Sequence, residues 1–237
     1  MTAFIQRSTI LAYFVALFAF IIAGITGSNL LSIITKPLLM PLLMFYVWLS
    51  MAHGAARNIL LAALFFSFAG DVLLMLEAVN SVLFIPGLVA FLFTHILYII
   101  YFFAIPSLKK SLLLTAPYLA IAVIIYGILL LYFLFPKLGI LKIPVLIYAG
   151  VILVMLLASM HAYTNVKKEA GRLFIAGALF FIISDSLLAI NKFHTPLDFP
   201  FTVILTYGIA QYLLVRGFVQ HSLSPIGKSV LLRPGEN

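Results

Sequence analysis

Apolar residues occupy eight long stretches of the chain, and short breaks rich in polar or turn-forming residues separate them. The stretches run over residues 9–25, 37–52, 58–76, 82–104, 111–134, 142–163, 172–190 and 200–219. A membrane-spanning helix needs roughly 20 consecutive, mostly apolar residues, and each stretch comes close to that length. The pattern predicts an all-α polytopic membrane protein folded as a single eight-transmembrane-helix bundle. No break is long enough to divide two domains, so we predict a membrane domain over residues 1–219 and a C-terminal tail over residues 220–237.

The composition excludes the main alternatives to a membrane protein. Of the 237 residues, 65% are hydrophobic and 8% are charged, against roughly 45–50% and 25% in soluble domains. Such a chain cannot cover a water-facing surface, which excludes soluble globular, disordered and disulfide-rich secreted proteins. The sequence contains no cysteine, so disulfides, thiolate nucleophiles and zinc–thiolate sites are also excluded.

Lysine and arginine are distributed unevenly between the two predicted ends of the bundle. Ten belong to the end that holds both termini: Arg7, Arg57, Lys109, Lys110, Lys167, Lys168, Arg172, Arg216, Lys228 and Arg233. Four belong to the opposite end: Lys36, Lys137, Lys142 and Lys192. Because loops rich in Lys and Arg stay on the cytoplasmic side, we predict that both termini and the tail are cytoplasmic. The net charge of +8 is then explained by topology at an anionic membrane, and we expect no nucleic-acid partner.

Two carboxylates lie inside predicted spans, where ionisable groups are costly and mark functional sites. Asp71 and Asp185 belong to the third and seventh stretches, whereas the other four acidic residues fall in loops or the tail. Each aspartate lies about five residues from the non-cytoplasmic end of its span, or roughly 7–8 Å deep at 1.5 Å per residue. We therefore predict that the two aspartates share one cavity.

The surroundings of the two aspartates resemble each other. Residues 70–76 and 184–190 both follow the pattern [GS]-D-x-L-L-x-[LI], and they lie four spans apart, which gives them the same orientation. Lys36-Pro37 and Lys142-Ile143-Pro144 likewise open the second and sixth spans. These matches predict a duplicated four-helix unit.

Further polar side chains fall in the same half of the bundle as the two aspartates. They are Ser67, His95, Tyr98, Tyr148, Ser184, Tyr207 and Gln211 within the spans, and Lys36, Asn191 and Lys192 at the outer rim. His95 and Tyr98 share one helix face, as do Tyr207 and Gln211. This convergence is typical of a site. Three other interpretations stay open: ion pairs of the aspartates with Lys36 or Lys192, interhelical hydrogen bonds, and lysine anchors at the membrane interface.

No metal or cofactor is predicted. His53, His161 and His221 lie near the cytoplasmic ends of their spans, far from His95, and no two histidines have helical ligand spacing. A three-histidine zinc site therefore cannot be assembled near the aspartates. The sequence also lacks a phosphate-binding glycine loop and a Gly-x-Ser-x-Gly nucleophile motif.

Four short motifs, taken together and in order, resemble the YhhN family of membrane lysoplasmalogenases. They are Ser67 to Leu74, then Phe91 with His95 and Tyr98, then Gly177 with Ser184 to Phe193, then Tyr207 with Gln211. Lys36-Pro37 also stands in its expected place, so the resemblance covers the second to eighth spans. It does not extend to the tail after about Val219.

The resemblance implies an eight-span hydrolase that cleaves the sn-1 vinyl ether of lysoplasmalogen. The products would be a fatty aldehyde and glycerophosphoethanolamine or glycerophosphocholine. The family's paired aspartates correspond to Asp71 and Asp185. The implied partners are a vinyl-ether lysophospholipid and membrane lipids, in an integral multi-pass protein of a bacterial or internal membrane.

The chemistry of a vinyl ether fits paired carboxylates. Its β-carbon accepts a proton, and water then captures the resulting oxocarbenium ion. One aspartate would donate the proton and the other would stay ionised, although the sequence does not assign the roles. His95 would orient one carboxylate or the water, Tyr98, Tyr207 and Gln211 would complete the network, and Lys36 or Lys192 would meet the lipid phosphate. Two competing hypotheses are a proton- or cation-coupled transporter with the aspartates as relay and a non-catalytic lysolipid or sterol binder.

Overall fold

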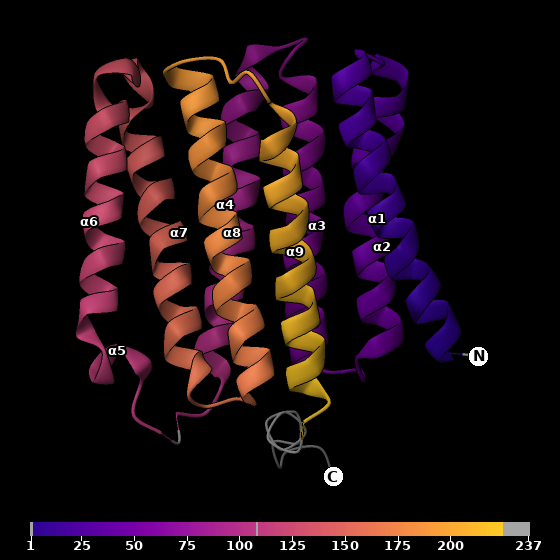
Figure 1. The fold of residues 1–237 in the computed structure, drawn as a ribbon, viewed down its shortest axis with the longest axis vertical. Helices are drawn as coiled ribbons and strands as arrows, with labels where there is room; N and C mark the ends of the chain where they lie inside the picture. The colour runs from indigo at the N-terminus through magenta and orange to yellow at the C-terminus, as the bar shows by residue number, and fades with distance from the viewer. Residues whose placement is uncertain (1, 108, 225–237) are drawn as a thin grey trace.

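The computed structural model of the protein describes residues 2–107 and 109–224, and all of the regular secondary structure in these ranges is helical (Figure 1). The helices are α1 (Thr2–Thr26), α2 (Asn29–Ser50), α3 (Ala55–Leu76), α4 (Phe84–Ala104), α5 (Leu112–Thr115), α6 (Pro117–Leu134), α7 (Lys142–Tyr163), α8 (Lys168–Phe193) and α9 (Phe201–Ser222). Three short 3₁₀ turns lie in the connections: η1 (Ser81–Leu83), η2 (Phe135–Lys137) and η3 (Gly139–Leu141).

Eight of these helices, all except the four-residue α5, are long and apolar enough to cross a membrane. Their outer faces carry large apolar side chains that are more than half exposed, such as Phe18, Trp48 and Leu129. In water such a surface would aggregate, whereas lipid tails are a suitable solvent for it. The protein is therefore a multi-pass integral membrane protein, as the hydrophobic pattern predicted.

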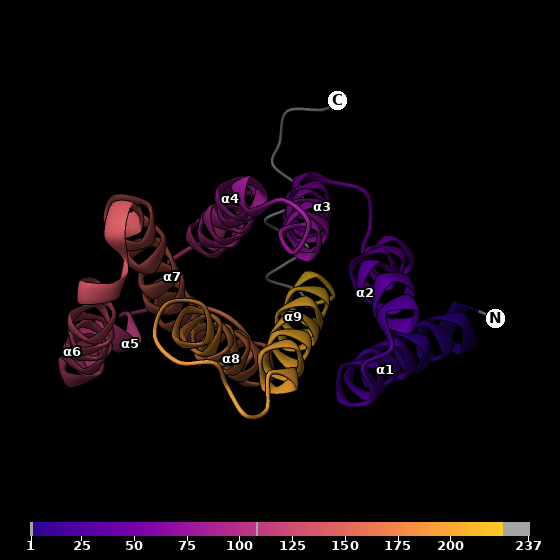
Figure 2. The same cartoon turned by 90° about the horizontal axis from the view of Figure 1, so that it is seen from above.

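The helices stand side by side, and α9 has α8 on one side, α3 on another, and α1 and α2 on a third (Figure 2). Helix α9 packs mainly against α8 and also contacts α1, α2 and α3, while α4 joins α3 to α7. Helix α6 lies at the periphery next to α7, and it buries only Val123, Gly127 and Leu134. The residues that α9 presents to its neighbours are thus the best enclosed in the bundle, and those of α6 are the most open to lipid.

A glycine brings α8 and α9 into close contact. A Cβ atom added at Gly177 of α8 would lie 2.9 Å from the backbone nitrogen of Leu214 and 3.1 Å from the carbonyl oxygen of Ala210, both on α9. Small residues allow such approach between membrane helices, where van der Waals packing drives association. This contact fixes the spacing of the two helices that carry Asp185 and Tyr207.

Helix α2 begins earlier than the sequence predicted, which moves Lys36. We expected Pro37 to open the second span, but α2 starts at Asn29 and contains both Pro37 and Pro41. Prolines occur inside membrane helices because neighbouring groups and local adjustments satisfy the freed backbone carbonyls. Lys36 consequently lies seven residues into α2, about 10 Å from its start, and not at the outer rim.

Helix α8 is also longer than predicted, so the two aspartates differ in depth along their helices. Asp71 lies five residues before the end of α3, as expected, but Asp185 lies eight residues before the end of α8, which is about 12 Å. Asn191 and Lys192 belong to the last turn of α8, because the helix continues to Phe193.

The predicted fifth span is interrupted near its start. Helix α5 ends at Thr115, and α6 begins at Pro117. Proline has no N–H to continue the hydrogen-bond ladder and restricts the residue before it, which explains the break. Helix α1 begins seven residues before the predicted start at Thr9, and α9 continues to Ser222. Residues 225–237 of the predicted tail lie outside the described residues.

Helix α1 begins and α9 ends at the same end of the bundle, the lower end in Figure 1. The two aspartates lie nearer the opposite end, where α3 and α8 finish. The cytoplasmic assignment of the termini and the four-helix duplication remain predictions from the sequence.

The absence of cysteine makes the predicted orientation testable by labelling. Single substitutions Lys167→Cys and Lys137→Cys place a thiol at exposed positions of the two opposite ends. We expect a membrane-impermeant maleimide to label Lys137→Cys in intact cells, and to label Lys167→Cys only after permeabilisation, because basic loops stay cytoplasmic. The unsubstituted chain is the blank. The reverse labelling pattern would refute the predicted orientation.

Candidate active site

Both aspartates line one cavity near the end of the bundle opposite the termini. This polar cavity has a volume of about 280 Å³ and is bordered by side chains of α1, α2, α3, α4, α8 and α9. Its polar lining consists of Lys36, Asp71, Ser184, Asp185, Asn191 and Tyr207. The remaining lining is largely apolar, so the charged groups face a small space with mostly apolar walls.

Asp71 is held by a cation and a hydroxyl group. The ammonium nitrogen of Lys36 lies 3.9 Å from Oδ1, and the Tyr207 hydroxyl donates a hydrogen bond of 2.8 Å to Oδ2. Phe91 packs edge-on against the Tyr207 ring, with 5.7 Å between the ring centroids. Gly70 leaves room for this arrangement, because a Cβ at that position would lie 2.7 Å from the Phe91 ring. Each oxygen of this buried carboxylate therefore faces a positive or hydrogen-bonding group.

Asp185 has a different environment. The Tyr148 hydroxyl donates a hydrogen bond of 2.5 Å to its Oδ2. Among residues 2–107 and 109–224, no Lys or Arg nitrogen lies within 4.0 Å of this carboxylate. The neighbouring Ser184 hydroxyl donates to the Val203 carbonyl oxygen of α9 at 2.9 Å, which fixes the backbone next to Asp185 without contacting its carboxylate.

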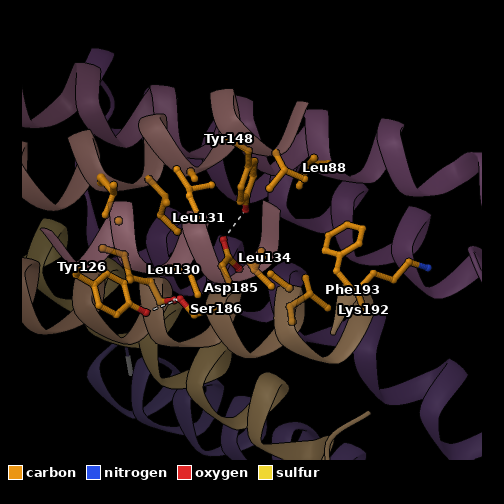
Figure 3. A pocket seen from close by; sticks show the side chains of 18 of the residues that line it. Leu88, Tyr126, Leu130, Leu131, Leu134, Tyr148, Asp185, Ser186, Lys192 and Phe193 are labelled. Atoms are coloured by element: carbon orange, nitrogen blue, oxygen red, sulfur yellow. Dashed lines mark hydrogen bonds between the residues drawn. The ribbon is translucent and has the colours of Figure 1, made fainter. Parts of the chain in front are cut away.

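A second cavity borders Asp185 on its other side. This apolar cavity lies between α6, α7 and α8, with Phe84 and Leu88 of α4 at one edge. Figure 3 shows Asp185 in its middle, with the Tyr148 hydroxyl pointing toward it. Asp185 and Leu188 line both the polar and the apolar cavity. Asp185 therefore lies at the boundary between the polar cavity and the apolar cavity.

Four buried polar side chains form a layer beneath Asp71, and we call them the buried layer: Ser67, Thr94, Tyr98 and Gln211. The Tyr98 hydroxyl donates to Oε1 of Gln211 at 2.7 Å, and Nε2 of Gln211 donates to the Ser67 hydroxyl at 2.9 Å. The hydroxyls of Ser67 and Thr94 are 3.1 Å apart. None of the four lines the polar cavity. Tyr98 and Gln211 thus link α4 to α9 and α3 in this layer. Of Tyr207 and Gln211, the pair predicted on one face of α9, only Tyr207 contacts Asp71.

His95 is fully buried, but it does not orient a carboxylate directly. Within the described residues, neither ring nitrogen is hydrogen-bonded to Asp71 or Asp185. Its ring packs edge-on against Tyr148, at 5.4 Å between centroids, and against Phe181 at 4.6 Å. His95 therefore contacts the site through the ring of Tyr148, the donor to Asp185.

Asn191 and Lys192 hold the outer end of α8. Lys192 pairs with Glu77 and lies 5.1 Å above the Phe84 ring, so it is not the partner of Asp185. Oδ1 of Asn191 accepts a hydrogen bond of 2.9 Å from the Leu197 backbone N–H in the connection to α9. Of the two lysines considered from the sequence, only Lys36 lines the polar cavity.

Three polar residues near the site were not predicted from the sequence. Tyr126 of α6 hydrogen-bonds to Ser186 at 2.7 Å, Thr94 belongs to the buried layer, and Tyr13 of α1 donates to the Gly208 carbonyl oxygen at 2.8 Å. All three are polar side chains inside apolar stretches, the same signal that singled out Tyr98. The described residues also contain no group of three His, Asp or Glu side chains arranged to hold a metal ion.

The buried layer should stabilise the bundle. We expect Gln211→Leu to lower the free energy of unfolding by about 1–3 kcal/mol, because it leaves the buried Tyr98 hydroxyl without its acceptor and removes the donor to Ser67. Gln220→Leu is the control on the same helix. The Gln220 side chain donates to Glu169 at the exposed end of the helix, where the loss should be within about 0.5 kcal/mol. Thermal unfolding in detergent measures both. Equal losses in the two variants would contradict a structural role for the buried layer.

Comparisons with known proteins identify the family of the chain. The model of the YhhN family matches residues 31–218, a range that contains both aspartates and Lys36. Over 190 residues the chain is 30% identical to the human protein named lysoplasmalogenase TMEM86B, covering 78% of this chain and 72% of that protein. No solved structure matches the chain. The family resemblance drawn from the four motifs is thereby confirmed, and the chain belongs to the YhhN family.

Proposed function

We propose that this protein is a lysoplasmalogenase, which hydrolyses the sn-1 vinyl ether of lysoplasmalogen to a fatty aldehyde and a glycerophospho-ethanolamine or -choline. The observation that carries the proposal is the placement of Asp71 and Asp185 on one membrane-embedded cavity with unlike partners. The name of the human relative supports the same substrate.

The reaction needs a proton donor, a stabilising negative charge and an oriented water. The donor transfers a proton to the β-carbon of the vinyl ether, and the double bond becomes an oxocarbenium ion. Water adds to that cation and loses a proton, which gives a hemiacetal. The hemiacetal collapses to the aldehyde and releases the glycerol oxygen as an alcohol. Glycosidases stabilise a similar cation with paired carboxylates.

The two environments favour a division of roles, with Asp185 as the proton donor and Asp71 as the ionised carboxylate. The ammonium group of Lys36 faces Asp71, and a nearby opposite charge favours the ionised form. Asp185 has no such cation within 4.0 Å among the described residues and borders the apolar cavity, where a neutral acid is less costly than a charge. Tyr148 occupies one oxygen of Asp185 and leaves the other for the proton.

Asp71 would then stabilise the oxocarbenium ion and accept the proton from water. Its orientation is fixed by Tyr207, which donates to Oδ2. Lys36 lines the same cavity with a side chain that is 17% exposed, so its ammonium can also meet the phosphate of the lipid headgroup. Lys36 thus has two functions in the proposal.

Removal of either carboxyl group tests the proposal directly. We expect Asp71→Asn and Asp185→Asn each to lower aldehyde release from lysoplasmalogen by about 100-fold or more, because each removes one proton-transfer group. Asp198→Asn, at an exposed loop position, is the matched control and should keep wild-type activity. Near-wild-type hydrolysis in either site variant would eliminate the paired-carboxylate mechanism, and lipid flux into liposomes without aldehyde would support a transporter instead.

Lys36 provides a second test. We expect Lys36→Met to lower kcat/KM by about 10- to 100-fold, the effect of losing a charge-assisted hydrogen bond, and Lys36→Arg to restore part of it. Lys142→Met is the control, because Lys142 lies over Phe135 outside the polar cavity. The same steady-state aldehyde assay measures all three variants. A Lys36→Met enzyme as active as the Lys142→Met enzyme would refute both functions given to Lys36.

A further inference from the structure

We infer that the apolar cavity between α6, α7 and α8 is the binding slot for the hydrocarbon chain of the lipid, and that it selects long-chain over short-chain substrates. This inference rests on the proposed function, since it assigns the part of the substrate that the polar cavity does not hold. Three features support this inference: the small residues that line the slot, its apolar lining, and its border with Asp185.

Small residues of three helices contribute to the lining of the slot. Gly127 of α6, Ala149 of α7 and Ala189 of α8 all line it. A Cβ atom at Gly127 would collide with the Leu153 side chain of α7, so Leu153 packs against α6 at a position that only glycine leaves free. Larger side chains at these positions would fill the space.

The lining of the slot contains few hydrogen-bonding or charged groups that are free to bind a polar ligand. Its hydroxyl and charged groups are already paired within the described residues: Tyr148 with Asp185, Tyr126 with Ser186, and Lys192 with Glu77 (Figure 3). The other lining residues are apolar. A saturated hydrocarbon needs no hydrogen bonds and gains roughly 0.8 kcal/mol for each buried CH₂ group. An alkyl chain is therefore the occupant that this lining fits.

The position of the slot matches the chemistry at its border. Asp185 and Leu188 separate the slot from the polar cavity that contains Lys36 and Asp71. A lysolipid with its phosphate at Lys36 and its chain in the slot would cross this border between headgroup and chain. That segment of the molecule is its vinyl ether, which is thereby placed next to Asp185.

Access to the slot from lipid is open along α6. This helix packs mainly on α7 and contributes few buried residues to the bundle. Tyr126, one of the lining residues, is 41% exposed on its outer side. A chain can therefore reach the slot sideways from the bilayer.

Blocking the slot should affect long chains selectively. We expect Ala149→Phe and Ala189→Phe, which fill the slot from opposite walls, to lower the kcat/KM ratio of hexadecenyl over butenyl vinyl-ether substrate by about tenfold or more. Ala122→Phe is the control, because Ala122 is an exposed residue of α6 outside the lining. Thermal unfolding verifies that each variant is folded, and the two walls provide independent variants if one is not.

A binding measurement separates this inference from the proposed function. Hexadecyl ether lysophosphoethanolamine has no double bond and cannot be hydrolysed by vinyl-ether chemistry, so its affinity is independent of turnover. We expect both slot variants to bind it about tenfold more weakly than the control. Suppose that the wild type binds the saturated ether more tightly than both slot variants and yet releases no aldehyde from lysoplasmalogen. That result would support the slot and refute the proposed function. If the wild type releases aldehyde but the slot variants keep the wild-type chain preference and affinity, the slot is refuted while the function stands. The same holds if the slot variants lose activity on the long-chain and the short-chain substrate equally.

Discussion

The buried charge of Asp71 is the constraint on which the rest of the site depends. An isolated carboxylate inside a membrane span costs several kcal/mol, and the structure offsets this cost with Lys36 on one oxygen and Tyr207 on the other. These partners come from α2 and α9, so the pairing requires three helices to meet at one depth. Beneath them the buried layer joins α3, α4 and α9 through its own hydrogen bonds. The charge and the bundle that surrounds it are therefore mutually dependent.

Asp185 shares a tyrosine donor with Asp71 but differs from it in having no Lys or Arg nitrogen within 4.0 Å among the described residues. Its donor is a phenol from α7, its neighbours are largely apolar, and it borders two cavities. Enzymes that use two carboxylates commonly place them in environments of unlike polarity, so that one holds a proton and the other does not. The difference here arises from which helices are adjacent: α2 supplies a lysine to Asp71 of α3, and α7 supplies a tyrosine to Asp185 of α8.

The sequence predicted the eight spans and the meeting of the two aspartates on one cavity, because hydrophobic length and intramembrane charge are local signals. The family was predicted from four short motifs in order. It misplaced Lys36, because Pro37 suggested a helix start, whereas α2 continues back to Asn29 with the proline inside it. It also grouped Tyr98 and Gln211 with the cavity. Helical spacing shows that two residues share a face, but not which neighbouring helix that face contacts. The pairing of Lys192 with Glu77 depended on the length of α8, which the apolar pattern underestimated.

The boundary position of Asp185 bears on how the two products leave after bond cleavage. A fatty aldehyde is soluble in the bilayer and a glycerophosphate ester is soluble in water. The two products of the proposed reaction would therefore partition into different phases. In the proposed reaction the aldehyde would lie in the apolar cavity beside the loosely packed α6, and the glycerophosphate ester would lie in the polar cavity near the bundle end. If the two products leave in different directions, they cannot recombine. The reactive aldehyde would then enter the lipid phase, away from the amines of soluble proteins.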